Sequence, residues 1–178
     1  MARALAEFFR SVEAADAYSY GFGKVRDFLS FPYEAQSHDW VITNPPFRLA
    51  EDFIERAFIV ARKGVAILAR TVFLESVGRY ENIFTANPPV KFAQFTERVP
   101  MVKGRLDAKA STATGYGWFV WEKGGLSLCR DLCGFHLVAR HWKSLGLRLC
   151  FKQGVKPVLE VVIRLLDKLD DRETEVLV

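Results

Sequence analysis

The stretch Asp39-Trp40-Val41-Ile42-Thr43-Asn44-Pro45-Pro46-Phe47 decides the fold, because an apolar run passes directly into a turn with two consecutive prolines. The run predicts a buried strand. Proline fixes φ, lacks an N–H group, and pushes the residue before it out of the helical region. Asn44-Pro45-Pro46 is therefore predicted to be a stiff, extended turn at the carboxyl end of a strand, where open α/β sheets bind ligands.

The residues of this turn have the chemistry needed to activate an amino group. The exocyclic nitrogen of adenine is a poor nucleophile because its lone pair is delocalised into the ring. The side-chain oxygen of Asn44 and the carbonyl of Pro45 can accept both of its N–H bonds and hold the nitrogen in line with an electrophilic methyl group. Phe47 can stack on the face of the base. The alternative is that the prolines merely end a strand and begin a helix.

The turn resembles the signature (Asn/Asp/Ser)-Pro-Pro-(Tyr/Phe) of class I S-adenosylmethionine-dependent amino-methyltransferases, in particular bacterial and phage-type DNA adenine-N6 methyltransferases. Asn44, Pro45, Pro46 and Phe47 match this signature. The resemblance continues to Trp121, over about two thirds of the chain, through residues 65–68, 73–75, 78–80 and 97–101. It implies S-adenosylmethionine as methyl donor and adenine in DNA as substrate. The turn alone does not separate DNA from RNA-base or protein-glutamine substrates.

Strands that alternate with helices predict an α/β protein with a mostly parallel, doubly wound sheet. Strands are expected within residues 11–16, 40–43, 65–69, 90–96 and 117–121, and helices within 2–9, 49–62 and 75–85. The last two strands have no helix between them, which predicts an antiparallel edge hairpin. The resemblance implies the same Rossmann-like methyltransferase fold. Residues 1–123 would form a partial catalytic domain, and 124–178 an unassigned tail with an amphipathic helix.

The amino-terminal part departs from the pattern of a cofactor-binding half-fold. Such a half-fold has a glycine-rich loop after its first strand and an acid about 20 residues later. Asp16 has the setting of that acid, but counting back the same distance passes Met1, so the first strand and its loop are expected to be missing. Gly21-Phe22-Gly23 is interpreted as an ordinary turn. Circular permutation is not expected, because Gly124-Gly125 follows the presumed last strand without a helix.

Two acids are the remaining candidates for the cofactor. By resemblance, Asp16 would bind the ribose of S-adenosylmethionine and Asp27 its adenine amino group. The alternative for each is a capping or solvated acid. Without the glycine loop, this chain is expected to bind the cofactor weakly or not at all.

Residues 98–114 form a basic segment between the presumed edge strands. Arg98, Lys103, Arg105 and Lys109 stand there against one acid. Basic groups beside the turn can contact phosphates and position DNA, and the alternative is a solvated loop. A contrasting hypothesis follows from the missing glycine loop: a non-catalytic nucleic-acid-binding or interaction module that acts through Lys103, Arg105 and Lys109.

Composition sets wider limits. A net charge of +4 is compatible with a polyanionic partner without requiring one. No apolar run is long enough to span a bilayer and no signal peptide is apparent, which together with three cysteines predicts a cytoplasmic protein without disulfides. One cluster has the ligand types of a zinc site: Cys129, Cys133, His136 and His141. Only two residues separate its cysteine pair from its histidine pair, which leaves little room for tetrahedral coordination, so no metal site is expected.

The tail has one apolar stripe at helical spacing, within residues 158–169. The stripe predicts packing onto its own domain, and the alternative is a homodimer or another partner contact. Because the resemblance ends near Gly124, a non-native reading frame beyond it is a further alternative.

Overall fold

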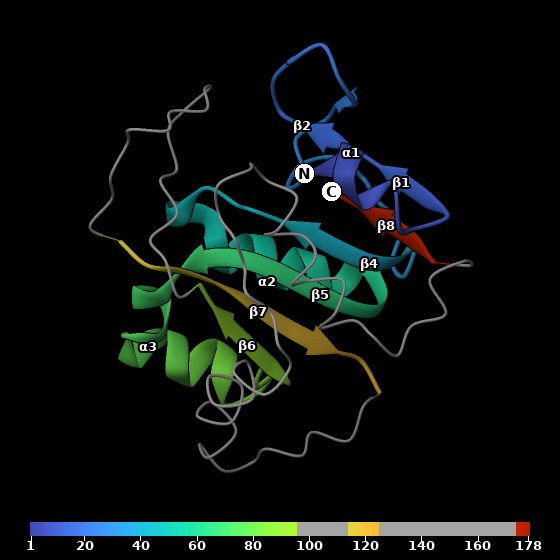
Figure 1. Cartoon of the computed structure of the whole chain (residues 1–178). Helices are drawn as coiled ribbons and strands as arrows, with labels where there is room; N and C mark the ends of the chain where they lie inside the picture. The colour runs from blue at the N-terminus through green and yellow to red at the C-terminus, as the bar shows by residue number, and fades with distance from the viewer. Residues whose placement is uncertain (96–113, 125–173) are drawn as a thin grey trace, which may run out of the picture.

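The computed structural model describes residues 1–95, 114–124 and 174–178, and Figure 1 shows the whole chain. Within these residues the main sheet has six strands in the order β1-β8-β4-β5-β7-β6, and β2 and β3 form a second sheet. The strands are β1 Ser11–Glu13, β2 Ala15–Asp16, β3 Lys24–Val25, β4 His38–Thr43, β5 Ala61–Arg70, β6 Lys91–Gln94, β7 Tyr116–Glu122 and β8 Glu175–Leu177. The α-helices are α1 Ala2–Leu5, α2 Ala50–Val60 and α3 Val77–Arg79; the 3₁₀ helices are η1 Phe47–Leu49 and η2 Thr71–Leu74, and η3 Tyr80–Phe84 is a π-helix.

The main sheet is mixed and mostly parallel, as the alternation of strands and helices predicted. β8 runs parallel to both β1 and β4, and β4 runs parallel to β5. β7 is antiparallel to both of its neighbours, β5 and β6. The predicted antiparallel pair therefore lies at one end of the sheet, with β6 on the outside.

The last strand of the chain lies inside the sheet. In β8, Val176 is in register with Val12 of β1 on one side and with Trp40 of β4 on the other. A doubly wound sheet of order 3-2-1-4-5-6 has its first strand in this position. The missing first strand stays a prediction of the sequence. The structure shows that a strand close to the carboxyl-terminal end, β8, lies between β1 and β4, which the sequence did not indicate.

The predicted boundary at residue 124 does not hold for β8. This strand belongs to the segment interpreted as a tail, yet it pairs within the same sheet as the predicted domain. A strand in register with both neighbours is also what a native reading frame would provide. The amphipathic stripe and the Cys/His cluster lie outside the described residues.

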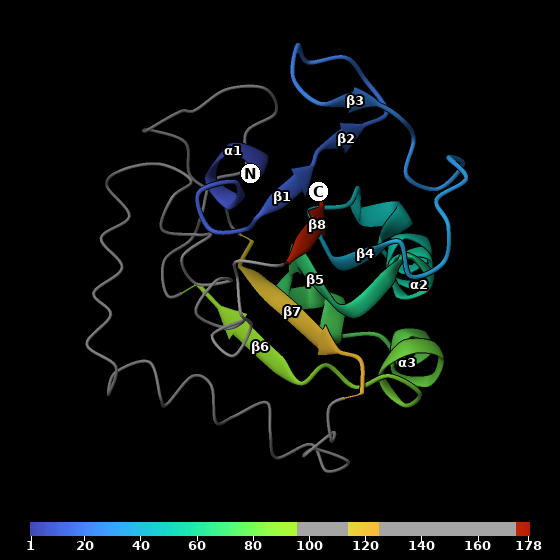
Figure 2. The ribbon, with the colours of Figure 1, turned by 90° about the vertical axis from the view of Figure 1, so that its right-hand side faces the viewer.

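Apolar side chains fill both faces of the sheet, which explains the unbroken apolar runs of β4 and β5. Successive residues of a strand point to opposite faces, so Trp40 and Ile42 belong to one cluster and Val41 to the other. Leu5 and Phe9, from α1 and the residues after it, join the cluster of Trp40. The face of Val41 is covered by α2, with α3 further along the same side (Figure 2).

A glycine directly after a helix-periodic segment is typical of a helix end, but Gly64 does not end the helix before it. The helix ends at Val60, and Ala61 is already extended, with φ −77° and ψ 140°. Gly64 lies inside β5, where a Cβ would overlap the indole ring of Trp40 and the carbonyl of Trp121. Packing against these groups, and not helix termination, requires glycine here.

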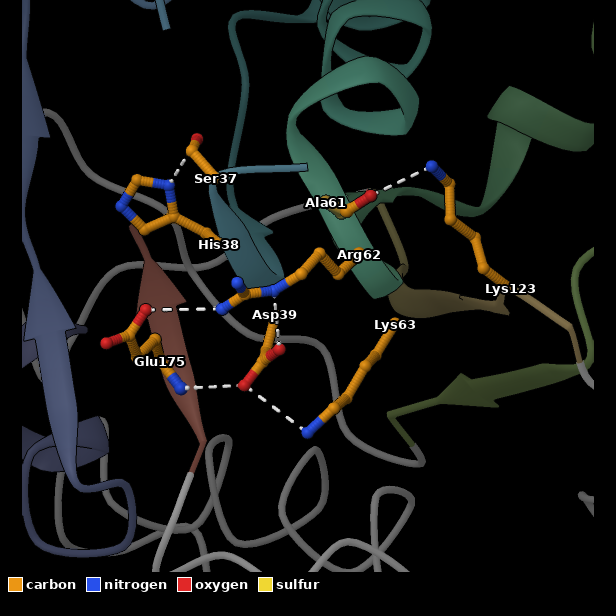
Figure 3. Close-up of polar contacts among 8 residues, drawn as sticks. All are labelled: Ser37, His38, Asp39, Ala61, Arg62, Lys63, Lys123 and Glu175. Carbon is orange, nitrogen blue, oxygen red and sulfur yellow. Dashed lines mark hydrogen bonds and ion pairs between the residues drawn. The ribbon is translucent and has the colours of Figure 1, made fainter. Parts of the chain in front are cut away.

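A buried carboxylate forms hydrogen bonds that link β8 to β4 and β5. The side chain of Asp39, in β4, is only 7% exposed. Its Oδ1 accepts a hydrogen bond from Arg62 Nε at 2.9 Å, and its Oδ2 accepts from Lys63 Nζ at 3.3 Å. The backbone N–H of Glu175 also donates to Oδ2, at 3.2 Å (Figure 3). One carboxylate thus connects β4, β5 and the start of β8.

We expect Asp39→Asn to lower the free energy of unfolding by about 1–3 kcal/mol, because an amide places an N–H₂ group against donors and leaves them unsatisfied. Urea unfolding followed by circular dichroism measures the change. Glu175→Gln is the control: it removes only the exposed ion pair with Arg62, and should cost less than about 1 kcal/mol. Equal losses in the two variants would contradict a central role for Asp39.

The same carboxylate makes stability depend on pH. Burial by itself raises the pKa of Asp39, but the Glu175 N–H and the Lys63 and Arg62 cations outweigh it and lower that pKa below its ordinary value of 3.8. As the pH falls, the unfolded chain therefore takes up this proton before the folded protein does. The stabilisation is present above about pH 4 and is lost as the pH falls through the lowered pKa.

We therefore expect the stability difference between the wild type and Asp39→Asn to shrink as the pH is lowered from 5 toward 3 (roughly the window set by this pKa). Urea titrations at several pH values measure it. A difference that stays constant over this range would show that the carboxylate is not the titrating group.

Candidate functional site

The Asn-Pro-Pro turn has the extended geometry that its prolines predict. It leaves the carboxyl end of β4, and Pro46 is extended with φ −57° and ψ 131° before η1 begins. Asn44 is exposed, whereas Pro45 is buried. The backbone N–H of Leu49 donates to the Pro46 carbonyl at 2.9 Å. Within the described part of the chain, no hydrogen bond engages the Asn44 side chain or the Pro45 carbonyl, so neither acceptor is already used there.

Phe47 follows the two prolines in the same turn, and the residue is 41% exposed. The guanidinium carbon of Arg70 lies 3.8 Å from the ring centroid, over the ring face. The ring of Tyr116 is further away, with centroids 6.1 Å apart and planes inclined by 40°. Sequence reasoning missed Arg70 and Tyr116.

The candidate cofactor acids lie at the carboxyl ends of the two strands of the second sheet. Asp16 ends β2 and Asp27 follows β3, and these strands run parallel to each other. The chain of β1 and β2 is also tied to β8, because Val178 N donates to Glu13 O and Ala15 N donates to Val178 O. Carboxyl ends of parallel strands meet at one edge. Asp16, Asp27 and Asn44 therefore each lie at the carboxyl end of a parallel strand, the two acids in the second sheet and Asn44 in the main sheet.

The two acids differ in how much of each carboxylate is already used. Asp16 is exposed, and its Oδ1 accepts from the Tyr18 backbone N–H at 2.9 Å. Asp27 accepts at both oxygens, from Leu29 N at 3.1 Å and from Ser30 Oγ at 3.0 Å. The geometry thus favours the turn-capping alternative for Asp27. Asp16 keeps an oxygen that its own turn does not use.

The loop between β2 and β3 projects from the sheet (Figure 2). Gly21 and Gly23 have positive φ values of 71° and 79°, which confirms the interpretation of this segment as a turn. Its aromatic side chains are exposed; they are Tyr18, Tyr20 and Phe22. This loop has no glycine-rich turn into a helix and does not replace a phosphate-binding loop.

A second polar site lies at the opposite edge of the main sheet, where its parallel strands begin. It is a depression of about 150 Å³ lined by Ser11, Glu13, His38, Glu175 and Val176. Burial lowers the pKa of His38, although Glu13 and Glu175 oppose the change. No motif in the sequence pointed to His38. The residues of the Asn-Pro-Pro turn do not line this depression.

Other predicted features can be located only in part. Arg98, Lys103, Arg105 and Lys109 lie outside the described residues. In residues 1–95, 114–124 and 174–178, no group of His, Cys, Asp and Glu side chains is arranged to hold a metal ion. None of the helices in these ranges is long and apolar enough to cross a membrane.

Comparisons of the chain with protein-family models, with curated proteins and with solved structures gave no match. The function is therefore argued from the geometry of this chain alone.

The contrast between the two acids can be tested by stability. Asp27→Ala should lower the free energy of unfolding by about 1 kcal/mol or more, because two hydrogen bonds within a turn are lost. Asp16→Ala removes one exposed hydrogen bond and should cost less. Urea unfolding of both variants measures the difference. A larger loss in Asp16→Ala would reverse the assignment of Asp27 as the capping acid.

Proposed function

We propose that this chain forms a Rossmann-like, S-adenosylmethionine-dependent methyltransferase domain that acts on the exocyclic N6 amine of adenine in DNA. One observation carries the proposal. In the described part of the chain, the side chain of Asn44 and the carbonyl of Pro45 have no hydrogen-bond partner, and the partly exposed Phe47 belongs to the same turn at the end of β4. These groups match an amino nitrogen that has two N–H bonds and belongs to a flat, aromatic base.

The sheet supports the proposal through its strand order. With β8 between β1 and β4, the strands follow the doubly wound arrangement, and the order reverses at the junction of β8 and β4. Ligands of such sheets bind outside the carboxyl ends of the strands at this junction. Asn44 follows β4 directly. The turn therefore occupies the position where a cofactor and a substrate would meet.

The described residues fit S-adenosylmethionine at its nucleoside end. Asp16 offers an exposed carboxylate at the end of β2, the setting of an acid that binds ribose hydroxyls. Asp27 fits less well, since its own turn uses both oxygens. No glycine-rich loop is found among the described residues, so we assign no residue to the methionine end. When bound, the cofactor would supply a methyl group on a positively charged sulfur.

The turn would activate and orient the amine. Asn44 Oδ1 and the Pro45 carbonyl would each accept one N–H bond from N6, which concentrates the lone pair on the nitrogen. The nitrogen would become positive when it accepts the methyl group and the carbon–sulfur bond of the donor breaks. The same two acceptors stabilise that charge until a proton leaves to water. Phe47 holds the plane of the base, so that the nitrogen approaches in line.

The proposal is tested by methyl transfer from radiolabelled S-adenosylmethionine to DNA, with RNA and a glutamine-containing peptide as parallel substrates. We expect label in DNA, on N6 of adenine, and a loss of about a hundredfold or more in Asn44→Ala, because an acceptor of developing charge is removed. Asn82→Ala is the matched control, since Asn82 is exposed in η3 and does not belong to the turn.

Calorimetry of cofactor binding separates the two stages of the reaction. Binding that is lost in Asp16→Ala would support the ribose assignment. Binding without transfer to any substrate would favour the contrasting hypothesis of a non-catalytic module. Equal turnover in Asn44→Ala and the wild type would contradict the proposed role of the turn.

A further inference from the structure

Arg70 lies over the ring of Phe47, next to the Asn-Pro-Pro turn, and has no acid partner among the described residues. It is the last residue of β5, the strand adjacent to β4. Three arginines of the described residues pair with carboxylates: Arg26 with Glu13, Arg62 with Asp39, and Arg79 with Glu51. Within the same residues no acid pairs with Arg70, and its buried Nε has no hydrogen-bond partner.

What Arg70 contacts is the ring of Phe47. The guanidinium carbon is 3.8 Å from the ring centroid, which is shorter than the corresponding distances at Arg3, Arg26 and Arg79, the other arginines that lie over aromatic rings. A guanidinium is planar and weakly hydrated, so it stacks on an aromatic face without needing water or a carboxylate.

The backbone fixes both partners of this contact. Arg70 is in register with Tyr116 of β7, so its place at the end of β5 is set by the sheet. Phe47 begins η1 immediately after the two prolines, so its backbone is set by a stiff turn. The contact between Arg70 and Phe47 therefore costs little additional backbone conformational entropy.

We infer that Arg70 is a positioning residue for the substrate base: it holds one face of the Phe47 ring and leaves the opposite face for a nucleobase. This inference rests on the proposed function and deepens it. Phe47 as a residue is 41% exposed although Arg70 lies over one face of its ring. Placing a cation on that face also draws electron density from the ring, which favours stacking of an electron-rich purine on the other. Arg70 acts through Phe47 and touches neither acceptor of the amine.

The inference is tested with Arg70→Gln, Arg70→Lys, Phe47→Leu and the double variant Arg70→Gln/Phe47→Leu. The probe is a DNA oligonucleotide with 2-aminopurine at one adenine position, whose fluorescence rises when the base leaves the stack. We expect Arg70→Gln to weaken binding and to raise KM for methylation, each by about two- to thirtyfold, the range of a cation–π contact. Arg70→Lys should recover part of this loss because a cation remains over the ring.

The double variant distinguishes positioning from general attraction to DNA. If Arg70 acts through Phe47, Arg70→Gln should have less than about a twofold effect when Phe47 is already leucine, so the two losses are not additive. Arg48→Gln is the charge-matched control, because Arg48 is exposed beside Phe47 in the same 3₁₀ helix. Circular dichroism confirms that each variant is folded.

The outcomes separate this inference from the proposed function. Methylation of adenine together with additive losses for Arg70→Gln and Phe47→Leu would overturn the positioning role and leave the proposed function standing. Equal losses in Arg48→Gln and Arg70→Gln would also overturn it, since net charge would then explain both. A wild-type chain that neither binds the oligonucleotide nor methylates adenine would overturn both proposals.

Discussion

The architecture depends on one buried carboxylate. Asp39 receives hydrogen bonds from two cations of β5 and from the first backbone N–H of β8, so three strands converge on it. A buried carboxylate needs all of its hydrogen-bond donors, because removing any one of them leaves part of the buried charge uncompensated. These hydrogen bonds hold β8 next to β4. Since β8 also pairs with β1, the same carboxylate indirectly fixes the amino-terminal strands, and with them Asp16, relative to Asn44.

Much of the sheet could be predicted from local sequence, and the place of β8 could not. The apolar runs of β4, β5 and β7 are buried on both faces, a pattern that a sequence shows directly. β8 has three residues, and residues 123–174 separate it from β7 in the sequence. Its place is decided by pairing with two strands far away in sequence and by the Asp39 contact to Glu175, and neither leaves a periodic signal. The role of Gly64 was not predictable for a related reason: the neighbour that demands glycine, Trp40, is close only in the fold.

The candidate site was partly predictable because the chemistry of a turn is local. Asn44, Pro45, Pro46 and Phe47 are consecutive, and proline dictates their backbone. The same reasoning about strand ends applies to Arg70, a charged residue that closes an apolar strand, but its stacking on Phe47 depends on β5 lying next to β4. Asp16 and Asp27 look alike in sequence. Only hydrogen bonds made after folding separate a carboxylate used by its own turn from one that is partly free.

The place of β8 also has a consequence for the order of folding. β1 and β4 are neighbours in the sheet only through β8, whose residues come more than a hundred positions later in the chain. During synthesis, the halves of the sheet on either side of this gap are therefore already outside the ribosome before the strand that joins them is made. Closing such a long loop is slow, and until then unpaired strand edges are exposed to other chains. The nascent protein would thus depend on protection from aggregation until β8 has been synthesised.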